Sequence, residues 1–510
     1  MTARYVTDLV GALERYAGRP SLGAHGAGLT FSELLDLVYR LAGALAEHGV
    51  GPGTGLACVF GGNRLEVLPV RLAAHVLGAR LTQIVADPYV HGLEFVLRDC
   101  LPRLVVHDVP VPDTGAARLA LDELLKEAAG REATPLPVRA REDDVARVTY
   151  TGGTTGVPKG VASTFRALGA RTDGRAGRDD HAGRNDRAGR DRGVDRGRLT
   201  YLSVTSLAHR SGGRCLEQLR CGGRVEVQDA FDTRKFAADC ARLGPVSTYL
   251  TPAMVYRLLD DPDTAAGIPG LSVVSYGAAP ILPERLYEAV TRWGGHWQQG
   301  YGMNEAAVIC RLTPADHEAA VAGRPELLAS VGRPVPGVEV EVRDAHGRAL
   351  PPGRTGEVWT RSAAMMTGYW NRPDLTAAAI RDGWLRTGDL GHADEDGYLH
   401  LDDRAADVVM VEGDNVYCLP VEAALTRHPG VAQAVVVGRH SPLTGEEVCA
   451  FLVPAPGRIP DAATAAEACD LVLATLAPAH RPTAVFWRQE IPLTPRGKPD
   501  KRRLREEATP

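Results

Sequence analysis

The residues with the clearest capacity for chemistry lie in one short segment, Tyr150 to Gly160, which reads YTGGTTGVPKG. Glycines let the backbone come close to a ligand and turn N–H groups toward its oxygen atoms. The threonines add hydroxyl donors, and Lys159 adds a mobile positive charge, so the segment suits a polyphosphate. It is not a Walker A loop, because no Gly-Lys-Ser/Thr sequence ends it. The candidate phosphate contacts are Thr151, Gly152, Gly153, Thr154, Thr155, Gly156 and Lys159.

A Gly/Thr-rich turn by itself is also typical of a plain loop, so other segments must decide. Six further segments have residue types suited to nucleotide chemistry. They are YGAAP from Tyr276, WQQGYGMNE from Trp297, GYW from Gly368, WLRTGD from Trp384, DDRAAD from Asp402 and PLTPRGKPDK from Pro492. Each of these segments, taken alone, could also have a purely structural role. Lys498, for example, lies in a basic tail, and Asp389 follows a glycine as turn residues do.

In this order, and over nearly the whole chain, the seven segments resemble the motifs of the adenylate-forming superfamily, which comprises acyl-CoA ligases, adenylation domains and luciferases. The resemblance implies that Tyr301 stacks near adenine and that Glu305 helps to hold Mg²⁺. It also implies that Asp389 and Arg404 reach the ribose and that Lys498 is the catalytic lysine. The implied nucleotide contacts outside the first loop are Gly277, Ala278, Ala279, Tyr301, Gly302, Asn304, Asp389 and Arg404.

The activity that the resemblance implies is that of an acyl-CoA ligase, with ATP/AMP, Mg²⁺ and coenzyme A as cofactors. A carboxylic acid would first form acyl-AMP and then the CoA thioester. Two anions meet in the first step, so the catalyst must neutralise charge, and Lys498 is the residue expected to bridge carboxylate and α-phosphate. The segment VEGDNVY from Val411 resembles the loop that lines the pantetheine tunnel, with Gly413 permitting close approach. The resemblance also implies that His209 lies near the acyl pocket, although a lone histidine is equally often structural.

Two alternatives remain open. The chain could mainly thioesterify a supplied acyl-adenylate, or adenylate an acid for a carrier-protein thiol. It could also be an inactive acyl- or nucleotide-binding homologue. Three positions depart from the common motifs, namely Gly153, Asn304 and Ala406. An amide at Asn304 is longer than the usual threonine hydroxyl and changes the donor presented to the α-phosphate.

Bulk properties exclude several classes of protein. A formal net charge of −5 gives no electrostatic case for nucleic acid. Nine cysteines without a C-x-x-C pair argue against a zinc site or disulfide framework and favour a reducing cytoplasm. The N-terminal residues carry charges where a signal peptide needs an apolar core, and no apolar run approaches the length of a membrane span. The expected partners are therefore small molecules rather than nucleic acid or membrane.

The hydrophobic pattern predicts an α/β fold. Helical spacing over residues 30–50 and 64–77 brackets a short buried strand at 55–60. Residues 335–361 alternate as in a small antiparallel β unit, and short α/β elements return after Asp403. By resemblance, residues 1–403 form a large AMP-binding domain and residues 404–510 a small mobile lid.

One tract fits this scheme poorly. Residues 171–198 are rich in Arg, Asp and Gly, with Val194 as the only sizeable aliphatic side chain. Such a composition cannot bury enough apolar surface to order itself, which predicts a disordered segment inside the large domain. A locally shifted reading frame, restored by Leu199, is an alternative explanation.

Overall fold

The computed structural model describes the chain in nine stretches. These are residues 1–24, 27–85, 92–151, 158–176, 195–404, 407–411, 414–441, 444–494 and 498–508. The chain divides into two compact units. The N-terminal unit comprises Met1–Leu328, Pro334–Glu339 and Thr360–Leu385, and the C-terminal unit comprises Ala329–Arg333, Val340–Trp359 and Arg386–Pro510. The mixed α/β architecture, with a large first unit and a small second one, confirms the predicted fold class.

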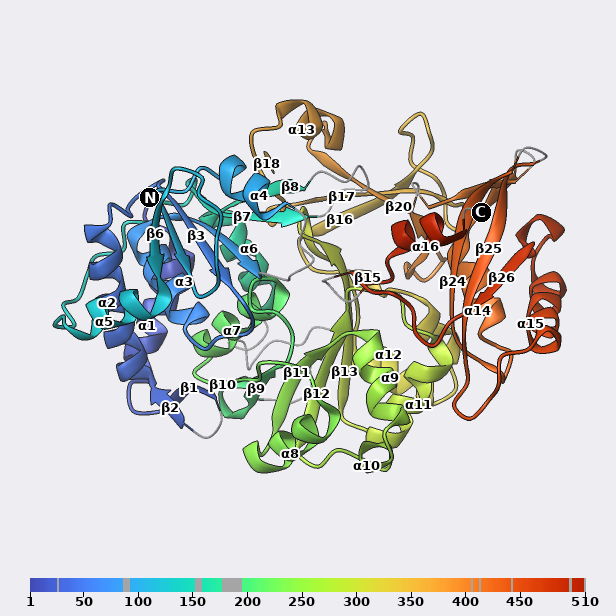
Figure 1. The fold of residues 1–510 in the computed structure, drawn as a ribbon, viewed down its shortest axis with the longest axis horizontal. Coiled ribbons are helices and arrows are strands. Elements are labelled where there is room, and N and C mark those ends of the chain that lie inside the picture. The colour runs from blue at the N-terminus through green and yellow to red at the C-terminus, as the bar shows by residue number, and fades with distance from the viewer. Residues whose placement is uncertain are drawn as a thin grey trace. The chain divides into compact units, whose positions relative to one another are not determined.

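The first sheet of the N-terminal unit has the order β18-β8-β7-β4-β3-β5-β6 (Figure 1). Its strands are β3 (Gly55–Phe60), β4 (Arg80–Val85), β5 (Leu104–His107), β6 (Ala117–Ala120), β7 (Val145–Thr151), β8 (Lys159–Thr164) and β18 (Gly368–Tyr369). Strands β3 to β7 pair in parallel, whereas β8 pairs antiparallel with both β7 and β18. All six residues of β3 are buried, as expected for an apolar strand covered on both faces.

The second sheet has the order β15-β14-β13-β12-β11-β9-β10-β1-β2. Its strands are β1 (Pro20–Ala24), β2 (Ala27–Thr30), β9 (Thr200–Ser203), β10 (Arg224–Val227), β11 (Val246–Leu250), β12 (Leu271–Gly277), β13 (His296–Met303), β14 (Ala307–Leu312) and β15 (Arg333–Pro334). Strands β10, β9, β11, β12 and β13 are parallel neighbours, so their carboxyl ends share one edge. That edge is where open α/β sheets bind ligands.

Helices cover these sheets. Those of the N-terminal unit are α1 (Arg4–Arg15), α2 (Phe31–Glu47), α3 (Val67–Leu77), α4 (Leu93–Asp99), α5 (Leu121–Ala129), α6 (Phe165–Ala176), α7 (Arg210–Arg220), α8 (Thr233–Leu243), α9 (Pro252–Asp260), α10 (Pro262–Ala265), α11 (Pro283–Trp293), α12 (Pro314–Val321) and α13 (Pro373–Ala379). Three short 3₁₀ helices also occur, η1 (Arg196–Arg198), η2 (Pro325–Ala329) and η3 (Pro478–His480).

Local sequence explains how the central helices begin and end. Helix α2 starts at a reciprocal cap, in which the Thr30 hydroxyl accepts from the Glu33 N–H and the Glu33 carboxylate accepts from the Thr30 N–H. Every residue of α3 is buried, and the helix contacts both α2 and α7. It ends at Gly78, whose φ of 74° is left-handed and whose missing Cβ would lie 3.0 Å from the Ala140 nitrogen.

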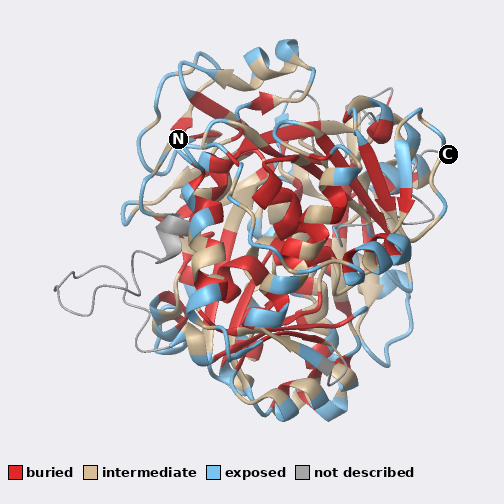
Figure 2. Cartoon of the chain, turned by 90° about the vertical axis from the view of Figure 1, so that its left-hand side faces the viewer, coloured by how far each residue is buried: buried red, intermediate tan, exposed pale blue. Residues whose placement is uncertain are grey.

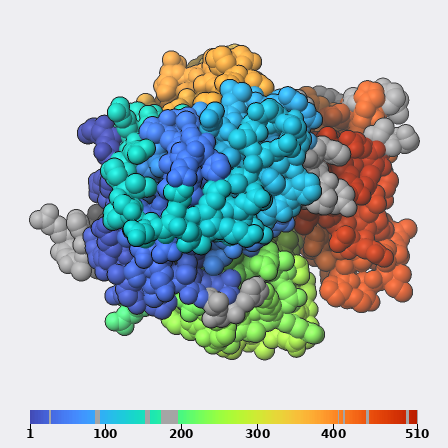
Figure 3. All heavy atoms as spheres, turned by 60° about the vertical axis from the view of Figure 1, so that its left-hand side comes forward, coloured from blue at the N-terminus to red at the C-terminus, as the bar shows by residue number. Residues whose placement is uncertain are grey.

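The core of the N-terminal unit is continuous from α1 to β11. Figure 2 shows the buried residues of this core in red and exposed residues in pale blue. In the space-filling view of Figure 3, the first third of the chain, coloured blue to teal, presents one closely packed surface. Among the described residues, no helix is long and apolar enough to cross a membrane.

The C-terminal unit is built on a sheet with the order β23-β22-β25-β24, to which β26 adds beside β25. Its elements are β22 (Val409–Val411), β23 (Asp414–Val416), α14 (Cys418–Leu425), β24 (Val431–Ser441), β25 (Gly445–Pro454), α15 (Ala462–Thr475), β26 (Ala484–Trp487) and α16 (Lys501–Ala508). A separate sheet of β16-β17-β20-β19, with β21 on β20, precedes it in the chain. Its strands are β16 (Val338–Arg343), β17 (Gly356–Ser362), β19 (Ile380–Arg381), β20 (Trp384–Ala393) and β21 (Leu399–Arg404).

The division between the units differs from the domain boundary predicted at residues 403/404. Strand β20 pairs with β21, with Asp389 opposite Arg404, so residues 386–403 group with the residues that follow them. Most of the small β unit predicted at 335–361 groups there as well. The family domain boundary at 403/404 therefore stays a prediction.

Both ends of the tract at residues 171–198, which the sequence predicts to be disordered, are helical. Residues 171–176 complete helix α6, and residues 196–198 form η1, where the Asp195 carboxylate accepts from the Gly197 N–H. Residues 177–194 lie outside the described residues. The composition argument missed the contribution of α6, whose first turns are anchored by the buried residues Phe165, Ala167 and Leu168.

Candidate active site

The predicted adenine-pocket residues lie at the carboxyl edge of the second sheet. Gly277 ends β12 and pairs with Gly300 of β13, next to Tyr301. A Cβ at Gly277 would lie 2.7 Å from the Gly300 carbonyl oxygen, so only glycine fits there. Ala278 follows with a left-handed φ of 73°, which turns the chain sharply away from the sheet. The fold thus brings the segments that begin at Tyr276 and Trp297 side by side, with Ala279 in the same turn.

Three predicted segments converge around Glu305. This carboxylate is only 6% exposed, and its Oε1 accepts a 3.1 Å hydrogen bond from the Tyr369 hydroxyl. The Lys159 ammonium lies 5.6 Å from the centroid of the Tyr369 ring, within the range of a cation–π contact. Burial and the Glu305 carboxylate raise the pKa of the Tyr369 phenol, which therefore stays protonated and donates. Strand β18 carries Tyr369 to this place by pairing with β8, directly after Lys159.

The Glu305 carboxylate suits a divalent cation bound together with a nucleotide. Mg²⁺ prefers oxygen ligands and is usually held by one or two carboxylates plus substrate phosphates and water. Among the described residues there is no group of three or more His, Cys, Asp or Glu side chains that would form a complete metal cage. A single carboxylate beside Lys159 therefore fits an ion whose remaining ligands come from the nucleotide and water.

An arginine that the sequence analysis had assigned to the disordered tract supports the Glu305 turn. Arg171 donates from Nη2 to the Asn304 carbonyl oxygen at 3.1 Å and to the Ser163 hydroxyl at 3.0 Å. Its Nε donates to the Ala364 carbonyl oxygen at 3.1 Å. Burial lowers the pKa of the Arg171 guanidinium to about 10, and the Glu305 carboxylate opposes this change, so the side chain remains charged at neutral pH. No motif marked this residue, and only the tertiary fold reveals its role.

A buried tyrosine–histidine pair lies behind the adenine-pocket turn. The Tyr276 hydroxyl donates to His317 Nε2 at 2.9 Å, while His317 Nδ1 donates to the Thr313 carbonyl oxygen at 2.7 Å. The carbonyl can only accept, so the proton of the neutral imidazole resides on Nδ1. Burial lowers the pKa of His317 to about 4.

This pair should make folding sensitive to acid. The folded-state pKa of His317 lies below the ordinary value near 6.5. Between these two pKa values the imidazole is protonated in the unfolded chain but neutral in the folded chain. The stabilisation is complete above pH 6.5 and is lost as the pH falls toward 4, by about 3 kcal/mol in total. Thermal melts at pH 7.5 and pH 5 should show a smaller acid-induced decrease in Tm for His317→Gln than for the parent. Equal decreases in the two proteins would contradict this assignment.

The first predicted loop is only partly described. Thr151 and Lys159 face each other as partners where the β7–β8 hairpin opens. Gly152, Gly153, Thr154, Thr155 and Gly156 lie outside the described residues, as do Ala406 and Gly413. His209 immediately precedes α7, is half-buried, and donates its backbone N–H to the Ser206 carbonyl oxygen at 3.2 Å.

In the C-terminal unit, the two predicted ribose contacts lie together. Asp389 is 7% exposed, and its Oδ1 lies 3.2 Å from Arg404 Nε across the β20–β21 pair. The Thr387 hydroxyl accepts from the Asp389 N–H at 3.0 Å and donates to the Val358 carbonyl oxygen at 2.7 Å. A carboxylate oriented in this way is a strong acceptor for a vicinal diol.

We expect Asp389→Ala to raise the dissociation constant for ATP about 10- to 100-fold. The change removes a charged acceptor, and such hydrogen bonds contribute about 1.5–3 kcal/mol. Binding of a fluorescent ATP analogue to the purified variant would measure the effect. Glu395→Ala is the matched control, because Glu395 is an exposed carboxylate in the turn between β20 and β21. A dissociation constant unchanged in Asp389→Ala would exclude the ribose role.

Lys498 is an exposed residue whose backbone pairs with that of Thr494. The Lys498 N–H donates to the Thr494 hydroxyl at 3.2 Å, and the Thr494 N–H donates to the Lys498 carbonyl oxygen at 2.7 Å. An isolated bridge between Leu493 and Pro499 lies next to this pair. The backbone of this lysine is therefore fixed, while its side chain is carried on the surface of the unit.

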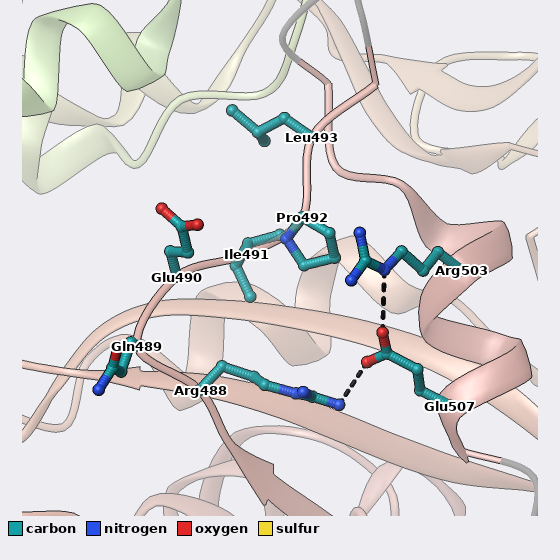
Figure 4. Close-up of a pocket in the computed structure, with 8 residues that line it drawn as sticks. All are labelled: Arg488, Gln489, Glu490, Ile491, Pro492, Leu493, Arg503 and Glu507. Carbon is teal, nitrogen blue, oxygen red and sulfur yellow. Dashed lines mark hydrogen bonds and ion pairs between the residues drawn. The ribbon is translucent and has the colours of Figure 1, made fainter. Parts of the chain in front are cut away.

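An open pocket lies along the segment that leads to this pair (Figure 4). Its lining residues are Arg488, Gln489, Glu490, Ile491, Pro492, Leu493, Arg503 and Glu507. Both arginines point toward Glu507, which pairs with Arg488 and lies 3.0 Å from Arg503 Nε. The two arginines therefore share one carboxylate.

Comparison with known proteins places these features in a family. A family model described as AMP-binding enzyme matches residues 11–370, and one described as AMP-binding enzyme C-terminal domain matches residues 420–498. The medium/long-chain-fatty-acid–CoA ligase FadD8 of Mycobacterium tuberculosis is 33% identical over 98% of this chain and 89% of its own length.

Solved structures agree over the full chain. The amide bond synthetase McbA from Marinactinospora thermotolerans has a TM-score of 0.81 and 34% identity, covering 98% of this chain and 99% of McbA. The o-succinylbenzoate coenzyme A synthetase MenE from Bacillus subtilis, in complex with ATP and magnesium ion, has a TM-score of 0.81 and 26% identity, covering 98% of each chain.

Proposed function

Since this chain belongs to the AMP-binding enzyme family, we propose that it is an AMP-forming carboxylate–CoA ligase whose site comprises the residues described above. It uses ATP, Mg²⁺ and coenzyme A. The convergence of Lys159, Tyr369 and Glu305 is the observation that most directly supports this function. It provides a positive charge for the phosphates of a nucleoside triphosphate and a carboxylate for the metal ion that accompanies them.

The first half-reaction joins two anions. A carboxylate oxygen of the acid attacks the α-phosphorus of ATP, and the bond to the bridging oxygen breaks, so that pyrophosphate leaves with the electron pair. Lys498 offsets the negative charge shared by the carboxylate and α-phosphate, and Lys159 offsets that of the leaving phosphates. Glu305 would hold Mg²⁺, which would supply further charge neutralisation there. The carboxylates of Asp389 and Glu305 differ in role: Asp389 accepts hydrogen bonds from the ribose, and Glu305 would hold the metal ion.

The second half-reaction needs no nucleophile from the protein. The thiol of coenzyme A attacks the acyl carbon, AMP leaves, and the thiol proton passes to solvent or to AMP. By the resemblance of its segment, Gly413 would permit close approach of the pantetheine arm, although it lies outside the described residues. We propose a cytoplasmic location, which the nine cysteines without a C-x-x-C pair support.

Acceptors other than coenzyme A could also take the acyl group. McbA is an amide bond synthetase, and its similarity to this chain supports an amine acceptor as a second candidate. A carrier-protein thiol is a third, and a chain that mainly thioesterifies a supplied adenylate remains an alternative. All four share the acyl-adenylate.

One experiment separates them. Purified protein is incubated with ATP, Mg²⁺ and a panel of acids, and then with coenzyme A, a small-amine mixture or a carrier protein. Detection of acyl-CoA and AMP by mass spectrometry would support the CoA ligase activity. Amide or acyl-carrier products without acyl-CoA would identify the other acceptors. If no acid is adenylated, synthetic acyl-adenylates are supplied with coenzyme A: acyl-CoA then indicates a thioesterification enzyme, and no product refutes the proposal.

A further inference from the structure

Two arginines of α7 reach the ligand-binding edge of the second sheet. Arg210 begins the helix and Arg214 lies one turn further, so both side chains emerge from the same face. Their guanidinium carbons lie 5.3 and 5.2 Å from the centroid of the Tyr249 ring. Tyr249 lies one residue before the carboxyl end of β11. Two cationic groups thus lie at the edge of the sheet where β12 and β13 present the predicted nucleotide contacts.

Neighbouring contacts show how closely Arg210 and Arg214 approach these strands. Arg214 Nη1 donates to the Ser275 hydroxyl at 3.1 Å, two residues before the end of β12. A Cβ built on Gly300 would lie 2.6 Å from Arg210 Nη2, so this guanidinium occupies the space above Gly300. Gly300 immediately precedes Tyr301, the predicted adenine contact. The Arg210 guanidinium therefore lies next to β13, the strand that carries the predicted adenine contact.

Tyr249 provides an independent sign of a ligand. Its side chain is 3% exposed, and within the part of the chain that the structure describes its hydroxyl has no hydrogen-bond partner. The hydroxyl points toward Gly277, where an added Cβ would lie 3.3 Å away. A buried hydroxyl without a partner costs about 1–3 kcal/mol, so such groups usually await an acceptor. The centroid of the same tyrosine ring lies within 5.3 Å of both guanidinium carbons, so an acceptor bound there would be close to two positive charges.

We infer that the acid substrate carries a second anionic group, distal to the reacting carboxylate, which Arg210 and Arg214 bind while the Tyr249 hydroxyl donates to it. An apolar acyl chain in this place would bring no counter-charge to either guanidinium group and no acceptor to the Tyr249 hydroxyl. A distal carboxylate or sulfonate forms charge-assisted hydrogen bonds instead. The inference rests on the proposed function and names its substrate class as acids with two anionic groups.

Matched acid pairs test it. Hexanoate and adipate differ only at the far end, as do cinnamate and 4-carboxycinnamate. AMP formation is measured for each acid with the parent, Arg210→Met, Arg214→Met and the control Arg292→Met, whose guanidinium is exposed on α11. The parent and the control should favour the diacids at least about tenfold in kcat/KM. Both α7 variants should lose this preference, and lysine at either position should restore part of it.

Other outcomes count against the inference. Preference for the monoacids in the parent would overturn it while leaving the ligase intact. A raised KM for ATP with unchanged acid preference would assign the two arginines to the triphosphate instead. If no acid yields AMP, the ligase proposal fails, and calorimetric titration of each acid pair in the presence of a non-hydrolysable ATP analogue decides the inference alone. Equal affinity for both members of each pair would then refute it.

Discussion

Lys498→Ala is expected to reduce AMP transfer at least about 100-fold while sparing thioesterification of a supplied acyl-adenylate. In the first half-reaction, the ammonium offsets charge that develops where carboxylate and phosphate meet, and removing one such group typically costs a factor of 10²–10³. In the second half-reaction no new anion pair forms. Pyrophosphate release and acyl-CoA formation from synthetic adenylate would be measured on the same preparation.

Arg502→Ala is the matched control for this variant. Arg502 belongs to the same basic tail, its side chain is 72% exposed, and its nearest acid is Glu506 at 3.9 Å. It should retain both half-reactions. An equal loss of both half-reactions in Lys498→Ala would contradict the role assigned to the lysine, because a general folding defect would then explain the result equally well.

Arg171→Met is expected to produce the second large effect, with a loss of about 2–6 kcal/mol of stability and a fall of about 100-fold in AMP formation. The change leaves the carbonyl oxygens of Asn304 and Ala364 without their donor, at about 1–3 kcal/mol each. The turn that carries Glu305 would then shift, and small displacements of a catalytic group cost about 10²-fold in rate.

The test requires both a denaturant melt and a pyrophosphate-release assay. Arg166→Met is the control, because Arg166 lies on the same helix but its side chain is half exposed and pairs with Asp143. It should change neither quantity substantially. Arg171→Lys should recover part of the activity, since a lysine can still reach one carbonyl. Full activity in a stably folded Arg171→Met protein would remove Arg171 from the list of positioning residues.

The sequence determined the fold class and several local elements. The reciprocal cap at Thr30 and the apolar period of residues 31–47 specify α2, and six consecutive apolar or small residues at 55–60 specify a buried strand. These signals are visible because they depend on neighbours a few residues apart. The order of the motif segments also identified the family, and the family models now show it.

Only the tertiary structure decided which residues support the motifs. The bond from Tyr369 to Glu305 joins residues 64 positions apart, and the bond from Arg171 to Asn304 joins residues 133 positions apart. A composition window sees Arg171 as one charge in a polar tract, whereas the fold surrounds it with carbonyl oxygens. Likewise, Tyr249 and Arg214 belong to no motif, and they meet Arg210, the residue after His209, only because α7 and β11 come together in the fold. Long-range pairing of this kind depends on how whole elements pack, and no local pattern encodes it.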